Sequence, residues 1–381
     1  MISWDMRRVI LSVIVFGFFA AFAAEGEAPL GTPRATIYYS AGFSIEYRQS
    51  YKLLIVKAPW PGASGGFRYV LYKRGDPKPR GLKADGFFET PLRKVVVLST
   101  TYVPQIVALG EADSIVGLDS AANVSSPEIR ARIASRAAVE TTRNWAPNIE
   151  LMISLAPDAV FTYGMGNEWD NHPKMAEAGL PIVVSGEWNE AEPLARAEWI
   201  KFIAAFYDKE DLASVYFDAI AKEYEALRSL ASSAKERPAV FVNGPFQGSW
   251  TVSGGRSFMA RFIADAGGSY LWSDDAGSGG ITLSIEAVYE RALRADIWLN
   301  PAITVNTKAD IAALDPRFVS LPAVTAGGVW NNNLRLSPGG GSDYFESAVL
   351  HPDKVLADLI KIFHPSLLTD RPFTYYKKID R

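Results

Sequence analysis

A stretch without glycine or proline, residues 194–237, constrains the fold of this chain more than any other feature. Both residues break helices, and they punctuate the rest of the sequence at short intervals. Within the stretch, apolar residues recur at three- and four-residue spacing and so share one stripe of an amphipathic helix: Leu212, Tyr216, Ala219, Ile220, Tyr224, Leu227, Leu230 and Ala234. The pattern predicts a short helix over 195–207. A long helix, capped by Asp208, then runs from near Lys209 to a point before Pro238.

Segments of similar design flank this predicted long helix. Apolar runs such as 94–98 and 239–242 alternate with helical segments on both sides of it. Strands that alternate with helices form right-handed βαβ units around a parallel sheet. A chain of 381 residues is also longer than one hydrophobic core usually serves. The sequence therefore predicts an α/β protein with two Rossmann-like lobes bridged by a single long α-helix.

The region before the first lobe has a different pattern. Apolar and polar residues alternate between glycines and prolines over 35–92, which predicts antiparallel strands and hairpins packed on the first lobe. The predicted domains are a signal peptide at 1–23, a β-rich extension over 35–92, an N-terminal α/β lobe over 93–194, linking helices over 195–236, a C-terminal α/β lobe over 237–366 and a tail over 367–381.

The N-terminus has the pattern of a secretory signal. Arg7 and Arg8 precede an apolar run, and Ala21 and Ala23 suit the positions next to a cleavage site. An uncleaved membrane anchor is the alternative, but the run is short for a span of about 20 residues. The chain contains no cysteine and hence no acceptor for a lipoprotein anchor. These features predict an exported, soluble protein of the periplasm.

Composition and missing motifs argue against several functions. The net charge is -3 with no basic block, which predicts no nucleic-acid partner. We find no Gly-x-Ser-x-Gly elbow, no Walker loop and no His-Glu-x-x-His zinc motif. Only three histidines are present, His172, His351 and His364, and the last two each precede a proline at an edge of the C-terminal helix, where capping or packing is expected; this predicts no metal site and no intrinsic cofactor. His172 alone lies in a loop that could face a ligand.

Several motifs carry a resemblance to a known family. They are 95–99, 109–117, 149–150 with 155–160, 197–202, Trp250 with 253–255, 265–272, and 352–353 with 362–365. Over roughly residues 93–364 the chain resembles substrate-binding proteins of ABC importers for ferric siderophores, haem and cobalamin. The resemblance implies two α/β lobes joined by one long helix, a ligand held in the cleft between them, and no catalysis.

The same resemblance implies a biological role. We expect a monomeric periplasmic protein that captures a chelated metal complex and delivers it to a dimeric ABC permease in the inner membrane. A ferric siderophore or related iron complex is the first expectation for the cargo, and cobalamin or haem is the alternative. A periplasmic sensory or docking domain, or an enzyme on the same two-lobe plan, is the alternative from another class.

A metal chelate is bulky, partly apolar and often anionic, so its site needs aromatic faces, guanidinium groups and loop donors. Loops at the carboxyl ends of parallel strands are where ligands bind open α/β sheets. The candidate ligand-binding residues are Thr101, Tyr102, Trp145, Tyr163, Trp188, Arg196, Gln247, Trp250, Arg256 and Trp330. We expect Trp250 to be a major contact, with burial in the core as the alternative for each tryptophan. Arg196 could instead pair with a carboxylate of its own helix.

Two glutamates hold equivalent positions in the predicted lobes. Glu150 and Glu286 each follow an isoleucine at the start of a short helix that leads to a strand. The family resemblance implies that both dock onto arginines of the permease. The alternative is that each only favours the positive N-terminal end of its helix, worth about 0.3–1 kcal/mol.

Overall fold

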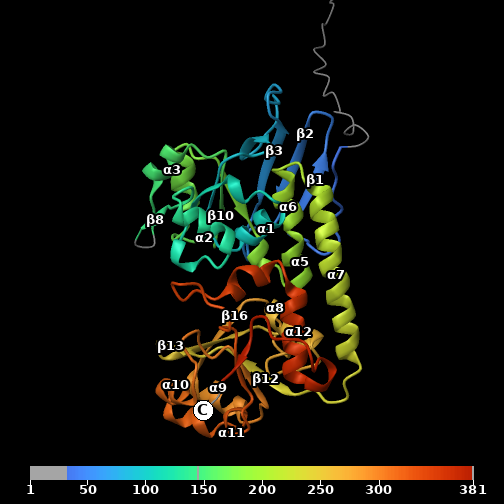
Figure 1. The fold of residues 1–381 in the computed structure, drawn as a ribbon, viewed down its shortest axis with the longest axis vertical. Coiled ribbons are helices and arrows are strands. Elements are labelled where there is room, and N and C mark those ends of the chain that lie inside the picture. The colour runs from blue at the N-terminus through green and yellow to red at the C-terminus, as the bar shows by residue number, and fades with distance from the viewer. Residues whose placement is uncertain (1–31, 144–145, 380–381) are drawn as a thin grey trace, which may run out of the picture.

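Two α/β lobes joined by a long helix make up the protein (Figure 1), as the sequence predicts. The computed structural model describes residues 32–143 and 146–379. The predicted signal peptide and Trp145 lie outside these residues. No helix within the described ranges combines the length and the apolar character that crossing a membrane requires.

The N-terminal lobe contains a five-stranded sheet in which all neighbours are parallel. In sheet order its strands are β11 (Ile182–Ser185), β10 (Ala159–Tyr163), β5 (Val95–Val97), β6 (Ile115–Leu118) and β7 (Val139–Glu140). Its helices are α1 (Tyr102–Ala108), α2 (Pro127–Ala134), α3 (Ile149–Leu155) and α4 (His172–Glu177), with η1 (Ala112–Ser114), η2 (Ala121–Asn123), η3 (Glu187–Asn189) and the short strands β8 (Thr142–Arg143) and β9 (Ala146–Pro147). All three residues of β5 are buried, as expected for a central strand covered on both faces.

The C-terminal lobe repeats this plan with a second five-stranded sheet. Its order is β15 (Ser269–Tyr270), β12 (Ala239–Val242), β17 (Ile297–Leu299), β18 (Val329–Asn331) and β19 (Lys377–Lys378), and only β19 is antiparallel to its neighbour. A smaller antiparallel sheet contains β13 (Pro245–Phe246), β14 (Ser249–Ser253) and β16 (Gly280–Ser284). The helices are α8 (Phe258–Asp265), α9 (Ile285–Ala292), α10 (Lys308–Leu314), α11 (Pro322–Thr325) and α12 (Pro352–Phe363), with η4 (Pro316–Ser320), η5 (Asp343–Phe345), η6 (Ser347–Val349) and η7 (Pro365–Leu367).

The end of the chain is built into the C-terminal lobe. Strand β19 pairs with β18, and Tyr375, Tyr376 and Ile379 are buried. The carboxylate of Asp358 in α12 accepts hydrogen bonds from the backbone N–H groups of Thr374, Tyr375 and Tyr376. Strand β19, which belongs to the predicted tail, therefore completes the sheet of the C-terminal lobe.

The β-rich extension forms a four-stranded sheet of β1 (Phe43–Tyr47), β2 (Tyr51–Val56), β3 (Phe67–Lys73) and β4 (Gly86–Thr90). The first three strands are antiparallel as predicted, whereas β4 runs parallel to β3. Phe43 packs against Trp199 and Phe202, with ring centroids 4.7 and 5.6 Å apart. The extension thus lies against the linking helices as well as the first lobe.

The connection between the lobes consists of α5 (Pro193–Glu198), α6 (Ile200–Ala205) and the long helix α7 (Glu210–Ser232). Helix α7 runs along one side of the molecule and packs against both α6 and α12 (Figure 1). It begins after Lys209 without a side-chain cap, because the predicted cap residue Asp208 adopts a positive φ of 55° and pairs with Lys52. The helix also ends several residues before the predicted terminus.

The buried stripe of α7 differs from the predicted one. Leu212 and Leu230 are 45% and 36% exposed, whereas Ala213 and Phe217 are buried together with Ile220, Tyr224, Leu227 and Ala231. Helix α7 carries apolar residues on a wider part of its surface than the neighbouring elements cover. The three- and four-residue spacing therefore does not show which of these apolar residues are buried. The packing of α6 and α12 decides which edge is buried.

Candidate functional site

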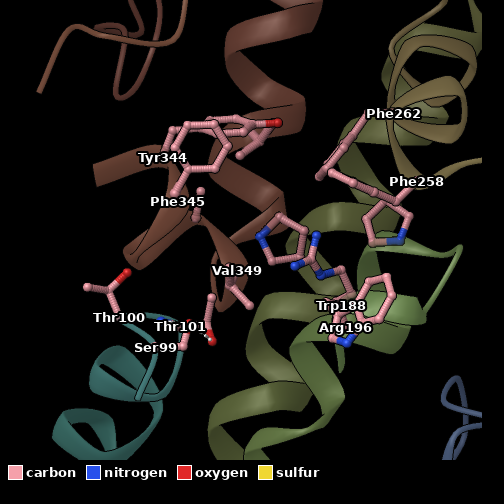
Figure 2. A pocket seen from close by; sticks show the side chains of 14 residues that line it. Ser99, Thr100, Thr101, Trp188, Arg196, Phe258, Phe262, Tyr344, Phe345 and Val349 are labelled. Atoms are coloured by element: carbon pink, nitrogen blue, oxygen red, sulfur yellow. Dashed lines mark hydrogen bonds between the residues drawn. The ribbon is translucent and has the colours of Figure 1, made fainter. Parts of the chain in front are cut away.

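A cavity of about 440 Å³, here called the interlobe cavity, lies where the two lobes meet beside α5. Figure 2 shows Ser99, Thr100 and Thr101 of the N-terminal lobe across from Tyr344, Phe345 and Val349 of the C-terminal lobe. The complete lining is Ser99, Thr100, Thr101, Trp188, Pro193, Arg196, Phe258, Phe262, Tyr344, Phe345, Ala348, Val349, Pro352 and Val355. Most of these side chains are apolar, and the volume lies in the usual range for small-molecule sites.

The polar edge of the interlobe cavity comes from the loop after β5. This loop follows the carboxyl end of a central parallel strand, which is the usual ligand-binding position in such sheets. The hydroxyl of Thr101 donates a 3.0 Å hydrogen bond to Oε1 of Glu187, and the hydroxyl of Ser185 donates to Oε2. Glu187 is buried, so it fixes the loop after β5 to the segment after β11.

Arg196 supplies the positive charge at the interlobe cavity. Its guanidinium carbon lies 4.7 Å from the centre of the Phe258 ring, and its Nε is buried without a hydrogen-bond partner. Among the described residues Arg196 makes no ion pair. Burial lowers the pKa of Arg196, and the negative charge of Glu187 partly opposes that change. A guanidinium nevertheless stays protonated in proteins, so a half-buried cation whose Nε lacks an acceptor lines the cavity.

The carboxylate within α5 belongs to Glu198, and its partners lie elsewhere. Glu198 is fully buried and pairs with Lys201 at 2.9 Å. It also accepts hydrogen bonds from the backbone N–H groups of Tyr38, Tyr39 and Ser40 in the segment before β1. The alternative pairing of Arg196 with its own helix is therefore absent.

Further polar and aromatic groups complete the interlobe cavity. The indole Nε1 of Trp188 is a second buried donor without a partner. Burial raises the pKa of Tyr344 to about 12, so its hydroxyl stays neutral near pH 7. Phe258 and Phe262 of α8 add aromatic surface to the lining. Two donors without acceptors among aromatic rings suit a ligand that carries negative charge on an otherwise apolar body.

A second cavity of about 380 Å³, here called the side cavity, adjoins the first. It is lined by Ser99, Thr101, Tyr163, Met165, Glu187 and Trp188, and it shares Ser99, Thr101 and Trp188 with the interlobe cavity. Tyr163 is the last residue of β10, Met165 lies in the loop after it, and the two are 45% and 54% exposed. The two cavities together give space for a bulky ligand.

A segment of the C-terminal lobe, residues 337–346, crosses to the N-terminal lobe beside the interlobe cavity; we call it the interlobe bridge. The hydroxyl of Ser337 donates to the carbonyl of Ala122 at 2.7 Å. The carboxylate of Glu346 accepts hydrogen bonds from the backbone N–H groups of Ser125 and Ser126 at 2.6 and 2.9 Å. Burial raises the pKa of Glu346 to about 7. The bridge thus joins the lobes and also carries Tyr344 and Phe345 of the lining.

The structure brings together four of the candidate ligand-binding residues. Thr101, Trp188 and Arg196 line the interlobe cavity, and Tyr163 lines the side cavity. Gln247 and Arg256 are exposed and line neither cavity, while Trp330 packs against Phe373 with ring centroids 5.0 Å apart. Trp145 lies outside the described residues.

The prediction that Trp250 is a major ligand contact is wrong. Its side chain is fully buried in the C-terminal lobe, where the indole N–H donates to the carbonyl of Val242 at 3.2 Å. The strand β14 alternates inward and outward side chains, and Trp250 falls on the inward face. Tyr102 is a similar case, because it is buried and its hydroxyl donates to the carbonyl of Thr162 at 2.6 Å.

Sequence reasoning also missed much of the lining. Phe258 and Phe262 lie one helical turn apart on α8, and neither is among the predicted ligand-binding residues. Their spacing and their position just after a glycine-rich turn were the available signal. Tyr344, Phe345 and Val349 belong to short 3₁₀ helices whose sequence has no clear periodicity. Only the packing of the lobes places them at the cavity.

The described residues offer no group of three or more histidine, aspartate or glutamate side chains able to hold a metal ion. The described linings of the two cavities include no histidine. His172 instead packs between Trp60 and Phe67, and His351 lies 3.3 Å from the hydroxyl of Tyr216.

Two similar α/β lobes with a cavity between them define a class of ligand-binding proteins, and comparison with known sequences identifies the family. The sequence model described as "Periplasmic binding protein" matches residues 95–331. The chain belongs to this family of periplasmic binding proteins. Membership implies a location outside the cytoplasmic membrane and a role in binding a solute. The β-rich extension lies outside the matched residues.

Individual proteins show the same relationship. An uncharacterized lipoprotein of Methanocaldococcus jannaschii is 28% identical over 331 residues, which are 82% of this chain and 76% of that protein. Its name gives no support to the prediction of a protein without a lipid anchor, although the present chain has no cysteine.

Two solved structures share the fold. An ABC-type Fe3+-hydroxamate transport system protein from Saccharomonospora viridis has a TM-score of 0.56 and 18% identity, over 73% of this chain and 95% of its own. A periplasmic heme binding protein from Pseudomonas aeruginosa has a TM-score of 0.54 and 17% identity, over 72% and 94%. At such low identities the likeness concerns the fold alone.

Proposed function

We propose that this protein is the solute-binding component of an ABC importer, and that its cargo is an anionic metal chelate held in the interlobe cavity. A ferric siderophore or a related iron complex is the first candidate. The observation that carries the proposal is the half-buried Arg196, which has a buried Nε without a hydrogen-bond partner, makes no ion pair among the described residues and lies among aromatic side chains. Two structural neighbours support this class of cargo: the heme binding protein of Pseudomonas aeruginosa and the Fe3+-hydroxamate transport protein of Saccharomonospora viridis.

The chemistry of the site fits such a ligand. An acidic group of the chelate would accept hydrogen bonds from Arg196 and Trp188, whose Nε and Nε1 atoms are buried without a hydrogen-bond partner. A hydrogen bond to a charged group contributes about 1.5–3 kcal/mol. Phe258 and Tyr344 offer apolar faces to the organic part of the chelate. Cobalamin and haem share this mixture of apolar body and polar groups and remain alternative cargoes.

The test is a binding screen with ferric hydroxamate, catecholate and carboxylate siderophores, haem and cobalamin, followed by titration calorimetry. Replacing Arg196 by Gln should weaken binding of the best chelate by roughly 10- to 100-fold, as expected for the loss of one charged hydrogen bond. Arg294→Gln, which changes an exposed arginine outside both cavities, is the matched control and should bind as the wild type does.

The stability of the ligand-free variant provides the second readout. Because burial opposes the charge of Arg196, Arg196→Gln should raise the melting temperature of the free protein while it lowers ligand affinity. If Arg196→Gln bound the chelate as tightly as the wild type does, Arg196 would not be a ligand-binding residue. Failure of every chelate in the screen to bind the wild-type protein would refute the proposed cargo.

The proposed transport role also needs contacts with the permease. Glu150 and Glu286 are exposed in the first turns of α3 and α9, after matching caps by Asn148 and Ser284. Glu286 lies 3.3 Å from Arg317, which itself pairs with Asp315 at 2.6 Å. Two equivalent carboxylates, one on each lobe, suit a two-fold symmetric partner that presents arginines.

Charge reversal at both positions tests the docking contacts. In the doubly substituted Glu150→Arg, Glu286→Arg protein, chelate affinity should stay normal while uptake by whole cells collapses, because attraction becomes repulsion. Glu128→Arg is the matched control, since Glu128 is also exposed in the first turn of a helix, α2. Normal uptake with the double variant would leave both glutamates as helix-end charges only.

A further inference from the structure

We propose that Trp60, in the loop between β2 and β3, is a positioning residue for the ligand site. It holds the loop of residues 164–170, which follows directly on Tyr163, and so sets where Tyr163 and Met165 lie at the side cavity. Of the described residues that line the two cavities, none belongs to the extension. The inference rests on the proposed function, because it gives the extension a role in ligand affinity without direct contact.

The indole of Trp60 fits against the loop backbone at two glycines. A Cβ atom added at Gly164 would lie 2.6 Å from a ring carbon of Trp60, and one added at Gly166 would lie 2.4 Å from its Nε1. Gly166 also has a positive φ of 76°, which other residues rarely adopt. The ring therefore occupies space that only glycine leaves open, next to Tyr163 and Met165, two of the residues that line the side cavity.

The ring is held at the other end of the loop as well. Trp60, Phe67 and His172 form a triangle whose ring centroids are 6.1, 5.9 and 5.9 Å apart. His172 is the first residue of α4, where the loop ends. Burial lowers the pKa of His172, so near pH 7 it packs as a neutral aromatic ring. Trp60 thus contacts the loop just after β10 and again where α4 begins.

Hydrogen bonds within the loop connect its residues to one another. The carboxylate of Asp170 accepts from the backbone N–H groups of Met165 and Gly166 at 2.7 and 2.8 Å. The backbone N–H of Trp169 donates to the side chain of Asn167 at 3.0 Å. A shift at Gly164 or His172 is therefore transmitted to Met165. Removing the indole should displace both cavity residues together.

The rest of the extension supports the neighbouring wall of the cavity. The hydroxyl of Tyr69 lies 2.8 Å from the backbone nitrogen of Val184 in β11, from which it accepts. The side-chain amide of Asn189 donates to the carbonyl of Ala58, and Glu190 accepts from the backbone N–H of Gly42. These contacts flank η3, which carries Trp188 of the shared lining. The family match begins after the extension, so this support is an addition to the matched fold.

Hydrogen exchange of the ligand-free protein is the first test. Trp60→Ala should accelerate exchange at the amides of Met165 and Gly166, which the Asp170 carboxylate protects. Trp60→Phe should largely restore the wild-type rates, because a smaller ring still fills part of the space. Phe87→Ala is the matched control, since Phe87 is a half-buried aromatic of the same sheet that packs on Lys78. This readout requires no ligand.

Affinity for the best chelate of the screen is the second test. Trp60→Ala should weaken it by roughly 2- to 30-fold, the range for substitutions that act through packed neighbours, and Trp60→Phe should recover most of the loss. Unchanged exchange in Trp60→Ala would overturn the inference whatever the chelate data show. Faster exchange with unchanged affinity would also overturn it, because the loop would then have no part in binding.

The two proposals can fail separately. If the wild-type protein binds none of the chelates, the proposed function fails and the claim about affinity fails with it. The exchange rates would still decide whether Trp60 holds the loop. If the wild type binds and Arg196→Gln loses affinity while Trp60→Ala does not, only the role of the extension is refuted.

Discussion

Truncation of Trp250 to alanine should cost the protein most of its stability while leaving the ligand site in place. The indole lies in an aromatic cluster of the C-terminal lobe, with ring centroids 6.0 Å from Phe241, 5.6 Å from Trp298 and 5.3 Å from Phe318. It contributes nothing to the described lining of either cavity. A cavity would therefore open inside the core rather than at the cleft.

The magnitude follows from what the substitution removes. Replacement of a buried aromatic residue by alanine costs about 3–5 kcal/mol. The hydrogen bond from the indole N–H to the carbonyl of Val242 is lost as well, for about another 1 kcal/mol. Total stabilities of folded proteins are about 5–15 kcal/mol, so the variant should be close to unfolded at 37 °C.

Chemical denaturation followed by far-ultraviolet circular dichroism measures this effect without relying on tryptophan fluorescence. Trp169→Ala is the matched control, because Trp169 is 77% exposed and its loss should change the free energy of unfolding by less than about 0.5 kcal/mol. A Trp250→Ala protein with near wild-type stability and a lower chelate affinity would contradict this prediction and would show that Trp250 contacts the ligand.

Two further predictions concern buried carboxylates. The pKa of Glu346 is raised from 4.5 to about 7 in the bridged state and returns toward its ordinary value when the interlobe bridge opens, so the closed state binds more protons. Acidification from pH 8 to pH 5 should therefore favour the closed bridge and slow chelate dissociation. Glu346→Gln should flatten the pH dependence of the dissociation rate. Equal pH profiles of the wild type and Glu346→Gln in stopped-flow measurements would contradict the prediction. Glu198→Ala should lower the free energy of unfolding by about 3–5 kcal/mol, because Lys201 would remain buried without its partner, and a loss below about 1 kcal/mol in denaturant titrations would contradict this.

Local pattern was enough to establish the plan of the molecule. The continuous apolar run at Val95–Val97 indicated a central parallel strand, and the absence of glycine and proline over 194–237 indicated the helical connection. Both signals act within a few residues of chain, because strand burial and helix termination depend on neighbouring side chains. The two lobes and the helix α7 followed from repeating such local inferences along the sequence.

Tertiary structure alone decided which side chains reach the ligand site. Trp188 and Trp250 both sit among turn-forming residues, yet one lines the interlobe cavity and the other is core, because strand pairing determines the inward face of β14. Glu198, the carboxylate of α5, pairs with Lys201 and with a segment more than 150 residues away, while Arg196 of the same helix makes no ion pair among the described residues. Such hydrogen bonds and ion pairs form between groups that are distant in sequence and compete for the same atoms. A local sequence pattern therefore does not predict which of them form.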